Sequence, residues 1–120
     1  MHNGVTPGGG VIAGIRFESA TLVHGYVLKR GVYTQFDAPG ATFTQAWDVS
    51  PTGTVVGYFN PVTSHGFSLD PDGFTVIDVP VPGARWTRIF GINPRGDMVG
   101  NYADASGRVH GFLLGGRGQK

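Results

Sequence analysis

The sequence predicts an all-β protein built from repeated units of four short strands. The first observation is a motif of histidine, glycine and an aromatic residue that occurs three times, beginning at His24, His65 and His110. The second is composition: 21 glycines and 8 prolines among 120 residues accompany a 40% share of hydrophobic residues, which is too apolar for a disordered chain and indicates many turns. The third is that apolar residues nowhere recur at helical spacing over a useful length.

Two further signatures accompany the histidine motif and make chance similarity implausible. A triplet ending in proline precedes the motif in every unit, and a segment of the form aromatic-Thr-x-apolar-Asp follows it in two. The triplets are Val5-Thr6-Pro7, Val49-Ser50-Pro51 and Ile92-Asn93-Pro94, and the segments end at Asp37 and Asp78. Because the order of the signatures is constant, the chain contains a true internal repeat.

The second unit shows the expected elements in order. Residues 43–49 alternate in the two-residue period of a strand, and residues 50–53 form a turn in which proline and glycine supply the required backbone angles. Strands are then expected at residues 54–59, 65–69 and 74–79, separated by loops rich in Pro, Asp and Gly.

Four strands in each 40–45 residues, followed by a longer Pro-Gly-Ala crossover, are typical of a β-propeller blade. A β-sandwich also has short strands and regular turns. Since a sandwich needs no self-similarity at a four-strand period, we favour the propeller.

The third unit carries the fullest form of the repeat, with Gly-Ile-Asn-Pro-Arg-Gly-Asp-Met-Val-Gly-Asn-Tyr at residues 91–102 and His-Gly-Phe-Leu at residues 110–113. These motifs resemble the HAF repeat of bacterial extracellular repeat proteins. The second unit departs from the pattern at Asp48, Ser50 and Ser68. The resemblance implies a propeller-like fold that is often secreted or exposed on the cell surface, and it brings no catalytic residues.

The expected organisation is a single repeat domain over residues 1–120, containing about two and a half blades. Residues 5–40 form a partial blade of three strands, residues 42–82 a complete blade, and residues 84–115 a second partial blade of three. Propellers close rings of about four to eight blades, and an open fragment would expose apolar blade faces. We therefore expect homo-oligomerisation to complete the ring, with a dimer favoured.

The repeated polar residues are expected to be structural. A metal site built from the three histidines is disfavoured, because equivalent positions on different blades lie too far apart to share one ion. We expect each histidine to bond a neighbouring strand or turn, the glycine after it to permit close backbone approach, and the aspartates to accept backbone N–H bonds rather than to act as acid–base groups. These residues are His24, Gly25, His65, Gly66, His110, Gly111, Asp37 and Asp78.

A second group of residues is a candidate ligand site. In a propeller, the crossover shares one face with the loop between the second and third strands, so residues from both can line one rim. These candidates are Phe43, Arg85, Trp86, Asp104 and Arg108, and aromatic rings with polar neighbours suit a carbohydrate. The tripeptide Arg95-Gly96-Asp97 falls on a hairpin turn, so we interpret it as a turn sequence and not as an adhesion motif.

Charge and composition exclude several function classes. The net charge is only +1, with no basic face, which disfavours nucleic-acid and membrane-surface partners. Without cysteine there is neither thiol catalysis nor a thiolate metal site, and no cofactor motif or signal peptide is recognised. The expected function is a non-enzymatic scaffold that self-assembles and binds proteins; the alternative is a lectin-like module that binds a glycan at its rim loops.

Overall fold

The computed structural model describes residues 2–5, 11–19, 22–29, 31–60, 63–70 and 73–115, with only the backbone described for the first of these ranges. Those residues form eleven strands and no helix, so the all-β prediction is confirmed. Within the same residues, no helix is long and apolar enough to cross a membrane.

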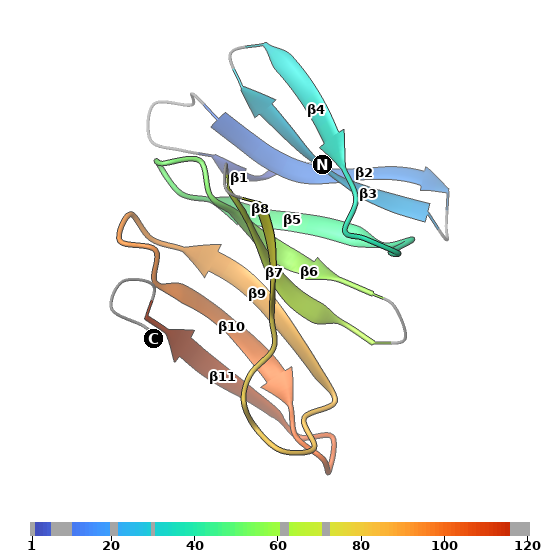
Figure 1. Ribbon diagram of the computed structural model, residues 1–120, viewed down its shortest axis with the longest axis vertical. Coiled ribbons are helices and arrows are strands. Elements are labelled where there is room, and N and C mark those ends of the chain that lie inside the picture. The colour runs from blue at the N-terminus through green and yellow to red at the C-terminus, as the bar shows by residue number, and fades with distance from the viewer. Residues whose placement is uncertain are drawn as a thin grey trace.

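The strands form three antiparallel sheets that follow one another in chain order (Figure 1). The first sheet contains β1 (His2–Val5), β2 (Val11–Ser19), β3 (Leu22–Lys29) and β4 (Val32–Phe36). The second contains β5 (Thr44–Val49), β6 (Val55–Phe59), β7 (His65–Asp70) and β8 (Gly73–Ile77). The third contains β9 (Trp86–Ile92), β10 (Met98–Ala103) and β11 (Val109–Leu114). None of the sheets closes on itself.

The first sheet has one strand more than the sequence predicts. Only Val5-Thr6-Pro7 was assigned to its innermost strand, and three strands were expected; the structure has four, because the backbone of residues 2–5 pairs with β2 through Gly4 opposite Ala13. Thr6 and Pro7 lie outside the described residues. The third sheet has the three strands that were expected.

Apolar side chains fill the space between consecutive sheets. Between the first and second sheets, the rings of Phe36 and Phe67 meet edge to face with centroids 5.9 Å apart. The buried cluster at this junction consists of Ala13, Ala38, Ala46, Val49, Val55, Phe59 and Phe67. Between the second and third sheets, the fully buried side chain of Ile89 lies against the backbone at Gly66. Each sheet is therefore held by its neighbour as well as by its own ladder.

A β-bulge in the innermost strand recurs in every sheet. The pairing register shifts at Trp47 in β5, at Phe90 in β9 and at Asn3 in β1. The bulge pushes a carbonyl towards the facing strand, so a Cβ atom at Gly57 would lie 1.8 Å from the oxygen of Gln45. The bulged Trp47 and Phe90 then contact each other between sheets, with ring centroids 5.1 Å apart.

The two crossovers between sheets have the same hydrogen-bonding pattern. Each contains a Pro-Gly turn closed by a backbone bond, and Gly40 and Gly83 have φ values of 74° and 79°. Each is fixed to the next sheet by a buried threonine: Thr44 Oγ1 accepts the N–H of Ala38 at 3.0 Å, and Thr87 Oγ1 accepts that of Val79 at 3.2 Å.

One side chain links two sheets directly. Asp48 occupies a position that is glycine in the other units, at Gly4 and Gly91. Its carboxylate accepts the N–H of Val49 at 2.9 Å and the N–H of Ile92, in the third sheet, at 3.0 Å. This departure from the repeat therefore fastens β9 to β5.

The three glycines that follow the histidines differ in their surroundings. A Cβ atom on Gly25 would lie 2.6 Å from the ring of Phe36, and one on Gly66 would lie 2.6 Å from the carbonyl oxygen of Ile77. At Gly111 the nearest atom would be 3.9 Å away, because no described strand lies beside β11 on that edge. The expected close approach of backbone is thus seen at Gly66, whereas the neighbour at Gly25 is a side-chain ring and no described atom comes as close at Gly111.

We predict that Gly57→Ala lowers the free energy of unfolding by about 3 kcal/mol, since the added methyl group collides with the bulged backbone of β5. Gly111→Ala, whose new methyl group would have no described atom closer than 3.9 Å, should change it by no more than about 0.5 kcal/mol. Chemical denaturation of both variants measures the difference. Equal stability of the two variants would contradict the assignment of the bulge.

Candidate functional site

The first repeated histidine is held between two carboxylates. His24 is buried, its Nδ1 lies 2.6 Å from Asp37 at the end of β4, and its Nε2 lies 2.9 Å from Glu18 in β2. The bonds to Asp37 and then to Glu18 stabilise the imidazolium and raise the pKa of His24 above its ordinary value, although burial opposes this.

The other two histidines each keep one half of this arrangement. His65 Nδ1 lies 3.2 Å from both carboxylate oxygens of Asp78, and His110 Nε2 lies 2.7 Å from Asp104. The Nδ1 partner is thus always thirteen residues after the histidine, and the carboxylate partner of Nε2 six residues before it. Asp37 and Asp78 accept bonds from side chains here, where bonds from backbone N–H groups were expected.

Asp104 is committed to its own hairpin turn. One carboxylate oxygen accepts the Ser106 hydroxyl at 2.6 Å and the N–H groups of Ser106 and Arg108 at 2.9 Å, and the other oxygen bonds His110. The Ser106 hydroxyl, His110 and the backbone together hold the pKa of Asp104 well below its usual range. Both carboxylate oxygens of Asp104 are thus engaged within this hairpin.

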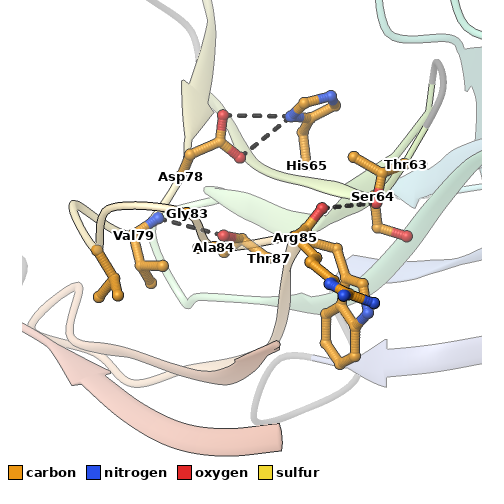
Figure 2. A pocket seen from close by; sticks show the side chains of 11 residues that line it. Thr63, Ser64, His65, Asp78, Val79, Gly83, Ala84, Arg85 and Thr87 are labelled. Carbon is orange, nitrogen blue, oxygen red and sulfur yellow. Dashed lines mark hydrogen bonds and ion pairs between the residues drawn. The ribbon is translucent and has the colours of Figure 1, made fainter. Parts of the chain in front are cut away.

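A small pocket lies where the second sheet meets the crossover to the third. Its volume is about 190 Å³. Figure 2 shows His65 and Asp78 facing each other on one side of the pocket, with Thr63, Ser64 and Arg85 on another. The remaining lining residues are Val79, Val81, Gly83, Ala84, Trp86 and Thr87. The walls thus combine a ring nitrogen, a carboxylate, hydroxyls and a guanidinium-bearing chain.

The pocket coincides with a departure from the repeat. Thr87 follows Asp78 by nine positions, whereas Thr44 follows Asp37 by seven, so the second crossover is two residues longer. The His65 side chain is 30% exposed, whereas that of His24 is 7% exposed. The longer connection therefore accompanies a histidine–aspartate pair that solvent and small molecules can reach.

The five ligand candidates are only partly brought together. Arg85 and Trp86 line the pocket, and the turn of residues 104–108 lies beside them, because Arg85 Nε donates to the carbonyl of Ala105 at 3.2 Å. The Arg88 guanidinium carbon lies 4.2 Å from the Trp86 ring centroid and covers one face of the indole.

Phe43 belongs to the preceding junction. It bridges to Val23 in the first sheet and lies near Tyr58, with ring centroids 6.2 Å apart. His65 and Asp78 were predicted to be structural and not to bind a ligand; the unequal crossover lengths are the signal in the sequence that distinguishes them.

The tripeptide Arg95-Gly96-Asp97 forms a hairpin turn. Gly96 has a φ of 87°, and its N–H donates to the carbonyl of Asn93. Arg95 and Asp97 bond each other at 3.0 Å, and Asp97 also accepts the Asn93 amide at 2.9 Å. The two charges are therefore engaged within the turn.

Comparison with protein families, with curated proteins and with solved structures found no match for the chain. The resemblance to HAF repeats stays a prediction. Among the described residues, no group of three or more His, Asp or Glu side chains has a geometry that could hold a metal ion.

We predict a pH-dependent contribution of His24 to stability. Because its folded-state pKa is raised, the stabilisation relative to His24→Gln is fully present below the unfolded-state pKa of 6.5 and is lost as pH rises through the folded-state pKa. Denaturation of both proteins between about pH 5 and 9 measures it. NMR titration of His24 in Asp37→Asn should show a lower pKa than in the parent, and a difference in stability that is constant with pH would refute the pairing.

Proposed function

We propose that the chain is a non-enzymatic repeat module of the β-propeller type, which assembles with a second copy of itself through its outermost sheets. The supporting observation is an exposed apolar surface, the end face, formed by Val99, Val109 and Leu113 on the side of the third sheet turned away from the second. These side chains are 48%, 54% and 72% exposed. Isolated apolar residues are ordinary on a surface, but here three share one face.

The internal repeat indicates what covers the end face. The counterpart of Val99 is Val56 in the second sheet, and the counterpart of Leu113 is Ser68; they are 0% and 8% exposed. They are buried because the third sheet packs on that side, as the contact of Ile89 with Gly66 shows. The end face therefore matches surfaces that receive another sheet of the same kind. A hollow of about 280 Å³ borders it, lined by Val99, Leu113 and Gly91 and also by Asp48 of the second sheet.

The first sheet offers the complementary surface. Its outward side carries the same repeat positions that the second and third sheets turn towards the preceding sheet, including Tyr26 at the position of Phe67 and Phe112. Tyr26 itself is buried, and the half-exposed Tyr33 is in ring contact with it. If the third sheet of each copy packs on the first sheet of the other, a twofold axis generates both contacts. The result is a closed ring of six sheets, within the range known for propellers.

Polar residues support a scaffold rather than an enzyme. Thr44 and Thr87 make equivalent bonds in successive crossovers, and His24 and His65 each bond the aspartate thirteen residues later. An active site needs groups with different chemical roles, such as a nucleophile and a base, gathered in one place.

We predict that the protein is a dimer of twice the 12.7 kDa chain mass at micromolar concentration, and that Leu113→Lys or Val99→Lys weakens association at least about tenfold by placing a charge in the apolar contact. Light scattering and sedimentation measure both. Val76→Lys, at an exposed valine in β8 outside the end face, is the matched control. A monomeric parent protein, or equal loss in the control, would refute the proposal.

A second function is supported by the pocket at His65. Its mixture of donors and acceptors beside Trp86 suits a hydroxyl-rich ligand such as a monosaccharide or a terminal sugar of a glycan. Because the unequal crossover creates this environment in one unit, a single sugar site per chain is proposed.

We predict that a glycan array identifies a ligand whose affinity falls about tenfold in Arg85→Ala and in Asp78→Asn, since each removes a charged hydrogen-bonding group from the wall. Arg95→Ala, which changes an exposed arginine on a distant turn, is the control. Absence of binding across the array, or equal affinities of the three variants, would refute carbohydrate recognition here.

A further inference from the structure

The third sheet has an open outer edge where the other two sheets have a strand. β4 pairs with β3 and β8 pairs with β7, each beside the strand that carries the histidine motif. β11 is the corresponding strand, and among the described residues it pairs only with β10. Its outer edge therefore presents backbone N–H and C=O groups in extended geometry, which readily accept another strand.

A groove lies along this edge. It has a volume of about 380 Å³ and a mainly apolar lining: Ile77, Val79, Pro80 and Val81 on the second-sheet side, with Tyr102, Phe112 and Leu114 on the third. The other lining residues are Asp78, Gly111 and the end-face residue Leu113. In the second sheet, Phe74 of the fourth strand packs on Phe59 and Phe67, with ring centroids 5.4 and 5.2 Å apart. Tyr102 and Phe112 are the counterparts of Phe59 and Phe67, so the groove is the place for an aromatic side chain equivalent to Phe74.

His110 presents a ring nitrogen to the same edge. In the first two sheets, Nδ1 of the histidine bonds an aspartate that follows the fourth strand, Asp37 or Asp78. His110 uses Nε2 for Asp104, as His24 uses Nε2 for Glu18, and Tyr102 stacks on its ring at 5.1 Å. No described residue bonds its Nδ1, so the ring is oriented for a carboxylate arriving from the outer edge.

Gly111 completes the surface. Its counterpart Gly66 faces Ile77 of the fourth strand, whose carbonyl oxygen would lie 2.6 Å from an added Cβ atom. Among the described residues, Gly111 has no such neighbour. A glycine at this position therefore leaves room for a strand that the described residues do not supply.

We propose that the outer edge of β11 is an acceptor site for an extended segment of a neighbouring polypeptide, which carries an aromatic residue followed four positions later by aspartate. The segment adds antiparallel to β11, its aromatic side chain enters the groove on Phe112, and its aspartate bonds His110 Nδ1. This is strand addition, with affinity from backbone hydrogen bonds and selectivity from the groove and the histidine.

The second sheet gives the register of the added strand. There, Leu69 lies opposite Phe74 and Gly66 opposite Ile77. The same pairing on β11 places the incoming aromatic residue opposite Leu114 and the residue before the aspartate opposite Gly111. Leu113 belongs to both the groove and the end face, so the test below alters the end face at Val99, which does not line the groove.

The test uses a fluorescent peptide with the sequence of residues 73–79, which contains Phe74 and Asp78, and measures its binding by anisotropy. The protein is the Val99→Lys variant, altered on the end face and not in the groove, so that failure of self-assembly and failure of strand addition remain distinguishable. We expect saturable binding, with NMR shifts in the amides of β11. A peptide with alanine at the Asp78 position should bind about tenfold more weakly, because it loses a charged hydrogen bond.

Gly111→Val in the protein is the decisive variant. It should retain the thermal stability of the parent, since the added side chain meets no described neighbour, and lose peptide binding, since it collides with the incoming backbone. If Gly111→Val lowers stability, Gly111→Ala provides the same comparison with a smaller group. Unchanged β11 amides, equal binding of a scrambled peptide, or undiminished binding by the glycine variants would overturn the proposal.

Discussion

The architecture depends on a backbone bulge in the innermost strand of each sheet. The bulge brings that strand unusually close to the second strand of the same sheet. At Gly57 and Gly100, a carbonyl from the bulged strand occupies the space of a missing side chain. The residue displaced by the bulge turns towards the next sheet, and Trp47 meets Phe90 there. The same bulge thus requires glycine on the facing strand and places an aromatic ring at the junction between sheets. Hydrogen bonding within a sheet and packing between sheets therefore depend on the same backbone feature.

The strands and their order were predictable because the repeat displays them three times. The histidine motif, the proline triplets and the Pro-Gly crossovers each appear with constant spacing, so hairpins and crossovers could be placed within one or two residues. The first strand was missed because His2 and Asn3, at its start, carry no repeated signature, and only Gly4 and Val5 match the other units. The bulge could not be predicted, since Trp47 fits the alternation of an ordinary strand.

Side-chain partners were less accessible from sequence. The thirteen-residue separation of His65 and Asp78 was visible, but the aspartates were interpreted as acceptors of backbone bonds. Asp104 was a ligand candidate by its position on a rim loop, and its carboxylate is used by the turn it begins. In both cases the loop or strand end was correctly placed, while the choice of hydrogen-bond partner depends on distances of a few tenths of an ångström that spacing does not determine.

The carboxylate of Asp48 has a consequence for how such a chain can diversify. Units that share a pattern are in principle interchangeable, and recombination between similar segments can duplicate, delete or reorder them. Asp48 bonds the backbone of β9, in the unit that follows its own, and the corresponding positions in the other units are glycines. A rearranged chain would place the Asp48 carboxylate against a different neighbour and lose its bond to Ile92. This one substitution therefore makes the order of the units matter and favours retention of the second and third units as an adjacent pair.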